Sequence, residues 1–216
     1  MSAAGFFHGV TVTNVDTGTR TIALPSSSII GLCDTFTPGP DVTAKPNQLM
    51  LLTSEREAVA AFGEGATITQ SAKAVFTRAK AVIVAVGVEL KEDSALLTSA
   101  IIGGVLVTGV RTGLQALLDG KSKFNSQPRL VIAPGHSSTQ AVATAMDALA
   151  GKLRAVAIVD GPNTTDEAAI DFVENFGSKR VFLVDPGVQM WDTVTSATID
   201  APASAWTAGL FAWTDA

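Results

Sequence analysis

The second half of the chain carries three short runs of continuous apolar residues, "RLVIAP" at 129–134, "RAVAIVD" at 154–160 and "RVFLVD" at 180–185. Proline and glycine follow each run, and a helix-like stretch precedes each one. Continuous hydrophobicity in strands that alternate with helices is typical of a parallel sheet covered on both faces. The pattern predicts an α/β fold with a mostly parallel sheet layered with helices.

The first half adds further elements of the same kind. Apolar runs at 29–33, 49–53 and 81–88 predict strands, and the prolines between residues 38 and 46 exclude a helix there. Ser54 and Glu57 form a capping box that predicts a helix up to Gly63, and a second amphipathic stretch covers 67–79.

Three more helices are predicted between the later strands, at 112–120, 137–154 and 164–177. Ser137 and Ser138 are expected to cap the second of them, and Thr164 with Glu167 forms a capping box for the third. Ahead of all these elements, "FFHGVTVTNVDTGTRTIAL" places valines among threonines and asparagine, which predicts strand material with a turn.

Composition excludes several classes of protein. A net charge of −5 argues against a surface that binds nucleic acid. The longest strongly apolar stretch, at 81–88, is too short to span a membrane, and the start of the chain does not resemble a signal peptide. The single cysteine, Cys33, lies in an apolar run and is interpreted as a buried small side chain rather than a nucleophile.

Candidate chemistry lies in the loops after the predicted strands, which carry His136, Asp160 and Asp185. The segment "GHSST" starts like a nucleophile elbow, but Thr139 replaces the second glycine. His8 and His136 are the only histidines, so a Ser–His–acid triad is disfavoured, and the aspartates fit turn chemistry.

No phosphate-binding glycine motif and no metal-ligand spacing occurs in the sequence. We therefore assign no catalytic, cofactor-binding or metal-binding residue. From the residues alone, a small α/β enzyme, hydrolase-like or Rossmann-like, with its site at these loops stays open as the alternative.

Read as a whole, the chain resembles the contractile tail sheath proteins of bacteriophages, most closely those of R-type pyocins and P2-like phages. The resemblance rests on stretches spread over nearly the whole length, among them "FFHGVTVTNVDTGTRTIAL", "LLTSEREAVAAFG", "TGLQALLDGKSKFNSQPRLVIAPGHSSTQAVATAMD", "FGSKRVFLVDPGVQMWD" and "ASAWTAGLFAWTDA".

The resemblance implies a structural subunit, not an enzyme, and no cofactor or ATP site. Such subunits polymerise helically around an inner tail tube, on a baseplate, and contract to drive the tube through a bacterial envelope. The implied location is the tail of a virion or pyocin particle, assembled in the cytoplasm of the bacterial host. The implied domains are an extended N-terminal arm at 1–20, an outer α/β domain at 21–200, and the start of an inner domain at 201–216.

The family continues beyond the segment that matches residues 203–216, so the resemblance implies that the C-terminal part is missing here. Trp206, Leu210 and Trp213 form one helical stripe that would need a partner surface. In the arm, strand addition to a neighbouring subunit is expected, and an ordinary first strand of the chain's own sheet is the alternative. Five apolar residues are its expected anchors at the subunit interface: Phe6, Phe7, Val10, Val12 and Val15.

Overall fold

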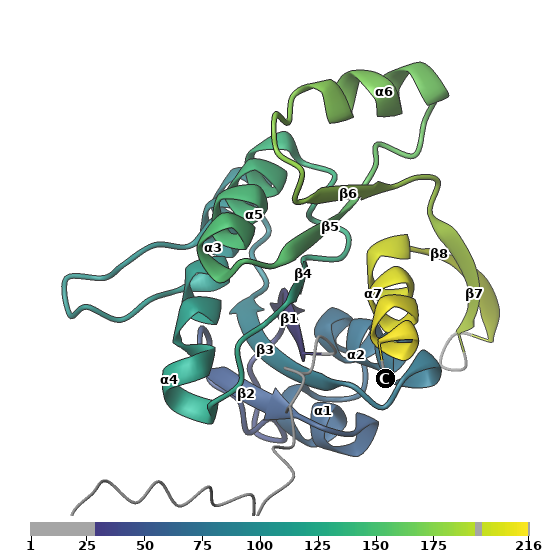
Figure 1. The fold of residues 1–216 in the computed structure, drawn as a ribbon. Helices are drawn as coiled ribbons and strands as arrows, with labels where there is room; N and C mark the ends of the chain where they lie inside the picture. The colour runs from purple at the N-terminus through teal and green to yellow at the C-terminus, as the bar shows by residue number, and fades with distance from the viewer. Residues whose placement is uncertain (1–28, 193–195, 216) are drawn as a thin grey trace, which may run out of the picture.

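A six-stranded sheet forms the centre of the protein (Figure 1), for which a computed structural model describes residues 29–192 and 196–215. The strand order is β2-β3-β1-β4-β5-β6; β2 runs antiparallel to β3, and every other neighbouring pair is parallel. The predicted α/β class with a mostly parallel sheet is confirmed. The strands are β1 Ile29–Phe36, β2 Leu49–Leu52, β3 Val82–Glu89, β4 Leu130–Ile132, β5 Val156–Asp160 and β6 Val181–Val184.

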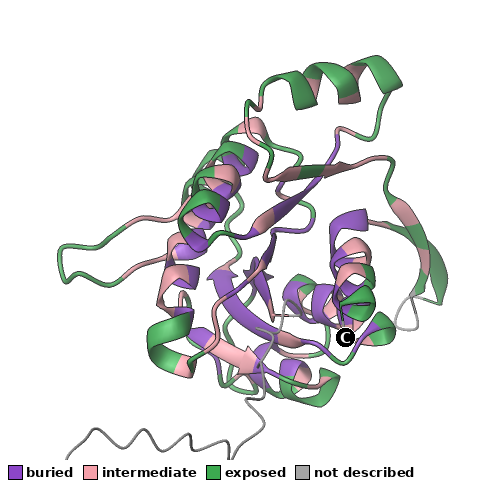
Figure 2. Cartoon of the chain, in the orientation of Figure 1, coloured by how far each residue is buried: buried purple, intermediate pink, exposed green. Residues whose placement is uncertain are grey.

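Helices cover both faces of this sheet, and their inward sides are buried (Figure 2). Successive side chains of a strand point to opposite faces, so Ile30 and Leu32 join one apolar cluster and Cys33 joins the other. The first cluster includes α1 Glu55–Phe62, α2 Thr67–Arg78 and α7 Ala203–Thr214. The second includes α3 Ser94–Ile102, the 3₁₀ helix η1 Gly113–Asp119 and α5 Gln140–Leu153.

The remaining elements lie at the margins. The short helix α4 Gly120–Phe124 continues from η1, and α6 Asp166–Glu174 contains no fully buried residue. The strands β7 Val188–Asp192 and β8 Ala197–Ala201 pair antiparallel as a separate hairpin beside α7 (Figure 1). None of the described helices is long and apolar enough to cross a membrane.

Side-chain caps mark the starts of α1, α3 and α6, while α6 and residues 112–120 each differ in one respect from the sequence-based expectations. The hydroxyl of Ser54 accepts a hydrogen bond from the Glu57 N–H at 3.4 Å, as the capping box predicts. The cap of α6 is Thr165 rather than Thr164, and its hydroxyl accepts from the Ala168 N–H at 3.2 Å. Residues 112–120, expected to form one α-helix, are mainly the 3₁₀ helix η1, whose i to i+3 bonds suit short connecting pieces.

One tight contact sets the packing between β1, β3 and α1. The rings of Phe36 and Phe62 meet edge to face, with their centroids 5.3 Å apart. A Cβ atom built on Gly87 would lie 2.6 Å from the Phe62 ring and 2.7 Å from the Phe36 ring. Only glycine leaves room for this aromatic pair at that point of β3.

The N-terminal arm lies outside the described residues. His8 and the five expected anchors, Phe6, Phe7, Val10, Val12 and Val15, belong to that segment. The assignment of these five anchors to a subunit interface therefore stays a prediction.

Candidate functional site

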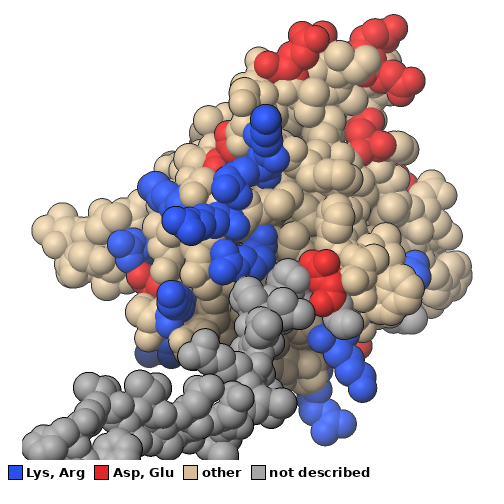
Figure 3. All heavy atoms as spheres, in the orientation of Figure 1, with Lys and Arg blue, Asp and Glu red and all other residues tan. Residues whose placement is uncertain are grey.

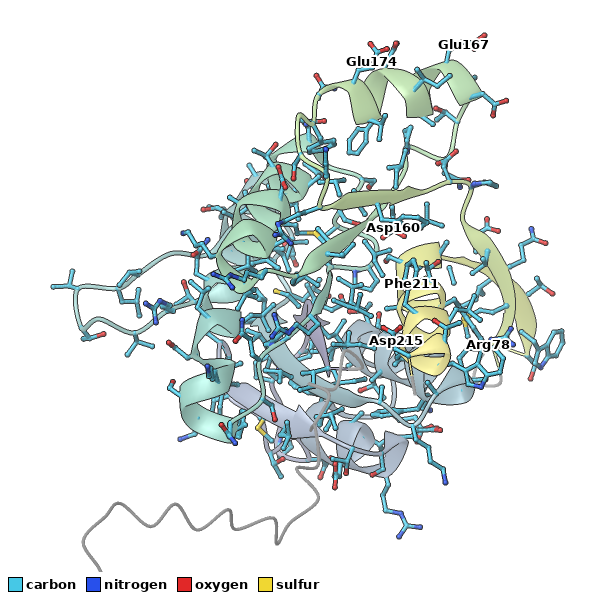
Figure 4. All side chains as sticks on the ribbon, in the orientation of Figure 1. Arg78, Asp160, Glu167, Glu174, Phe211 and Asp215 are labelled. Atoms are coloured by element: carbon cyan, nitrogen blue, oxygen red, sulfur yellow. The ribbon has the colours of Figure 1, made fainter. Side chains whose placement is uncertain are left out.

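A buried carboxylate joins three elements at the carboxyl ends of the parallel strands. Asp160, the last residue of β5, is only 7% exposed. One of its oxygens accepts the hydroxyls of Ser137 and Ser204 at 2.8 Å each, and the other accepts the Ser204 N–H at 2.8 Å. The Gly135 N–H adds a weaker bond at 3.3 Å. Figure 4 shows Asp160 between the sheet and α7.

These bonds fix the start of α7 to the sheet. Pro202 precedes α7 and provides no side-chain cap, so the first N–H groups of the helix need an acceptor from elsewhere. Asp160 supplies it at the positive end of the helix dipole. The carboxylate acts as a cap contributed by a distant strand, which is a structural role.

Ser137 does not cap α5, contrary to the sequence-based expectation. The residue that precedes α5 is Thr139, and it makes no side-chain capping bond. Ser137 is fully buried, and its hydroxyl donates to the Asp160 carboxylate while accepting the Asp160 N–H at 2.9 Å. A buried carboxylate is a stronger acceptor than the local backbone can offer, so the non-local partner prevails.

A second buried carboxylate, Asp34, lies at the end of β1. It is 1% exposed, and it accepts the Ser71 hydroxyl at 2.7 Å and the Thr67 hydroxyl at 2.9 Å. The Nε2 atom of His136 approaches it at 3.3 Å. Ser71 bonds the carboxylate and not the imidazole, whereas a nucleophilic serine would need the imidazole as its base. The cluster ties α2 and the loop after β4 to the sheet.

Cys33 behaves as the sequence predicts. It is fully buried. Burial is the larger cause and the neighbouring negative charge of Asp34 the smaller cause that raise the pKa of its thiol. A thiol held protonated in this way is a poor nucleophile. In the described part of the chain, no group of three His, Cys, Asp or Glu side chains could hold a metal ion.

The surface of α7 is unusual because the fully buried residues of the helix are all small, whereas two of its large residues are exposed. The fully buried side is made of Ala203, Ser204, Ala205, Ala208, Gly209 and Ala212. A Cβ atom on Gly209 would lie 3.1 Å from the Val75 carbonyl oxygen, so α7 and α2 approach closely. The opposite side carries Leu210, 48% exposed, and Trp213, 64% exposed.

The three residues of the predicted stripe are therefore placed differently from one another. Leu210 and Trp213 face solvent, while Trp206 is half-buried, with the Arg78 guanidinium carbon 5.2 Å from its ring centroid. The indole N–H of Trp206 is buried and has no hydrogen-bond partner among the described residues. Phe211 of α7, labelled in Figure 4, meets Phe182 of β6 edge to face, with the ring centroids 5.2 Å apart.

Comparison with known proteins decides what this arrangement belongs to. The phage tail sheath protein central domain matches residues 109–216, the second half of the chain. The chain belongs to the phage tail sheath protein family. This confirms the resemblance on which the expected function rests.

Individual sheath proteins extend the similarity over almost the whole chain. A prophage major tail sheath protein of Pseudomonas aeruginosa (strain UCBPP-PA14) is 68% identical over 98% of the chain. The tail sheath protein of Escherichia phage P2 is 33% identical over 97% of it. The chain covers 55% and 54% of these two proteins, so it spans about half the length of the curated relatives it matches.

Solved structures show the same fold. One is the sheath complex of an extracellular contractile injection system, PVC, in its contracted state. It matches with a TM-score of 0.60 at 16% identity, and the match covers 99% of this chain and 52% of the sheath chain. The contracted helical sheath of the anti-feeding prophage has a TM-score of 0.55 at 18% identity, and covers 94% of this chain and 53% of its own. The proteins named here are sheath components, and they give no support to the enzyme alternative.

For a sheath protein, the surfaces that matter are those that can meet other chains. Charge is distributed unevenly over them: acidic side chains gather on α6, where Glu167 and Glu174 point outward, and Lys and Arg gather over another part of the same face (Figures 3 and 4). Exposed apolar residues include Leu210 and Trp213 on α7 and Trp191, 62% exposed, on β7. Acidic, basic and apolar side chains are thus exposed on separate parts of the described surface.

Proposed function

We propose that this chain is part of a structural subunit of a contractile tail sheath, which polymerises around an inner tube and contracts to drive that tube through a bacterial cell envelope. The observation that carries the proposal is the family match over residues 109–216, together with 68% identity to a prophage major tail sheath protein. The proposed action needs no catalytic residue, because repacking of many subunit contacts supplies the free energy.

The proposed division of labour follows the expected domains. Residues 21–200 would form the outer α/β domain, and residues 201–216 would begin the inner domain with α7, whose Asp160 contact is already made within this chain. The exposed Leu210 and Trp213, with Trp206 beside them, would then pack against another part of the sheath. Burying the parts of these two side chains that are still exposed contributes roughly 2–3 kcal/mol.

The arm at 1–20 is proposed to add a strand to a neighbouring subunit, with Phe6, Phe7, Val10, Val12 and Val15 as its apolar anchors. Main-chain hydrogen bonds of an added strand hold two subunits together without fixing how their domains are oriented. The inner tube and the baseplate are the further proposed partners. Assembly in the host cytoplasm and residence in the tail of a virion or pyocin particle complete the proposal.

Electron microscopy of the full-length protein that carries this chain tests the function. Tubular polymers of uniform diameter are expected, and compact particles that never polymerise with tube protein present would overturn it. Val12→Pro should abolish polymers because proline removes a ladder donor, whereas Val12→Thr should weaken them only mildly. If Val12→Pro instead lowers the monomer's melting temperature by as much as a core substitution does, the arm is an internal strand.

A further inference from the structure

A loop between α3 and η1 holds four apolar side chains in solvent. Val107 is fully exposed, and Val105, Leu106 and Val110 are each more than half exposed. The loop extends well away from the sheet and the helices on its side of the molecule (Figure 1). Clustered exposed apolar residues of this kind mark a contact with another surface.

The loop has a defined shape, so its exposure is part of the fold. The Leu106 N–H donates to the Val110 carbonyl at 2.8 Å, and the Gly109 N–H donates to the Leu106 carbonyl at 2.8 Å. At its base, Gly103 has a φ of 65° and a Cβ there would lie 1.9 Å from the Thr112 carbonyl oxygen. Only glycine permits that closure, and a preformed loop binds a partner with little loss of conformational entropy.

An apolar cavity of about 360 Å³ lies elsewhere on the chain, under the β7–β8 hairpin. Its walls come from the ends of β1 and β3, the start of α2, the loop after β4, the hairpin and α7. They include Leu90, Pro134, Met190, Ile199, Pro202 and Trp206. Leu90 and Ile199 are 55% and 37% exposed, so the entrance is apolar as well. Asp34 also lines the cavity, but its carboxylate already accepts hydrogen bonds from Ser71 and Thr67.

The loop and the cavity lie on different faces of the sheet. The loop connects α3 and η1, which pack on one face, and the cavity is lined by α2 and α7, which pack on the other. The two surfaces therefore cannot meet within one chain, but they can meet between two. A contact between unlike surfaces of identical subunits is heterologous, and it propagates into an open helix when the rotation does not close a ring.

We propose that residues 105–110 of one sheath subunit insert into the cavity under the β7–β8 hairpin of the next subunit. The proposal rests on the proposed function, because it requires that copies of this chain assemble. It identifies one heterologous contact between subunits. The apolar loop of one subunit inserts, and the cavity between α2, α7 and the hairpin of the next subunit receives it. A helical sheath needs such a pair of unlike surfaces on every subunit.

Disulfide cross-linking between two cysteine variants tests this contact directly. Leu90→Cys and Val107→Cys, each made in the full-length protein, are mixed, polymerised and oxidised. Cys33 gives no background, because it is fully buried. We expect a covalent dimer only in the mixture and only after polymerisation. The matched control replaces Val107→Cys with Val173→Cys, an exposed valine on α6, and should give no dimer with Leu90→Cys.

A second pair of variants measures the strength of the contact. Val107→Asp should raise the protein concentration needed for polymers at least about tenfold, since a valine would be lost from a buried site. Val173→Asp, the same change on α6, should leave it within about twofold. Normal polymers from both variants with no Leu90–Val107 cross-link overturn this contact and leave the proposed function standing. Failure of the unsubstituted protein to polymerise overturns both.

Discussion

Replacing Asp160 by alanine tests how α7 is held to the sheet. The change removes a carboxylate that is 7% exposed and accepts bonds from Ser137, Ser204 and Gly135. The serines are fully buried, so their hydroxyls cannot turn to water without opening the structure. Asp160→Asn should be milder, because the amide keeps one acceptor oxygen. It still costs stability, because its NH₂ group faces donors that need an acceptor.

The magnitude follows from counting the donors left without an acceptor. The Ser204 N–H, the Ser204 hydroxyl and the Ser137 hydroxyl each bond the carboxylate at 2.8 Å. A buried donor without a partner costs about 1–3 kcal/mol, and partial relaxation reduces the sum. We expect Asp160→Ala to lower the free energy of unfolding by about 3–5 kcal/mol and Asp160→Asn by about 2–3 kcal/mol.

Urea unfolding followed by circular dichroism measures these differences, and hydrogen exchange of α7 amides locates them. Asp171→Ala, which removes an exposed carboxylate from α6, is the matched control and should change stability by less than about 0.5 kcal/mol. In a double-mutant cycle, Asp160 and Ser204 should show a coupling of about 1–2 kcal/mol. A loss for Asp160→Ala no larger than that for Asp171→Ala would refute the proposed role of the carboxylate.

Two other sites give separate tests. Gly87→Ala should lower the free energy of unfolding in urea by about 1–3 kcal/mol, because its Cβ would lie 2.6 Å from the Phe62 ring. Gly151→Ala is the control and should be neutral or stabilising, because no atom lies within 4 Å of the added Cβ. Equal effects of the two changes would contradict the steric account. Hydrogen bonds from the Thr53 N–H, followed by the Thr53 hydroxyl, hold the pKa of Glu57 below its usual value. That stabilisation is present above the ordinary glutamate pKa and is lost as the pH falls through the depressed one. Glu57→Gln should therefore lower the melting temperature at pH 7, and this deficit should shrink as the pH falls through the depressed pKa; a deficit that is independent of pH would contradict this.

Much of the sheet could be predicted from the sequence because its signals are local. The apolar runs at 81–88, 129–134 and 154–160 become β3, β4 and β5, since strands buried on both faces need apolar residues at successive positions. The run at 180–185 becomes β6, an edge strand that is only partly buried. The helix α3 was not predicted, although Asp93 accepts hydrogen bonds from Ala95 and Leu96 and could have identified its start. The β7–β8 hairpin was also missed: Ala197–Ala201 does alternate apolar and polar residues, but both strands are only five residues long and mostly exposed.

The polar contacts could not be predicted, because their partners lie far apart in the chain. Ser137 has a local reason to cap α5, and only the fold reveals that Asp160, 23 residues later, offers a better acceptor. The contact between Asp160 and Ser204 spans 44 residues. The stripe of Trp206, Leu210 and Trp213 could be predicted only in part. Helical spacing indicates that the three residues lie on one side of the helix, but it does not indicate that Trp206 packs partly against the core.

The way α7 is attached has a mechanical consequence. Its first turn is bonded to Asp160, its body touches α2 through alanines and Gly209, and its 12 residues extend about 18 Å to the last turn. A smooth face of small side chains offers little resistance to sliding or tilting, whereas the two charge-assisted bonds from Ser204 to Asp160 at one end resist displacement. A load applied at Trp213 would therefore act on α7 as on a lever, with its pivot at Asp160 and its torque delivered to the carboxyl end of β5.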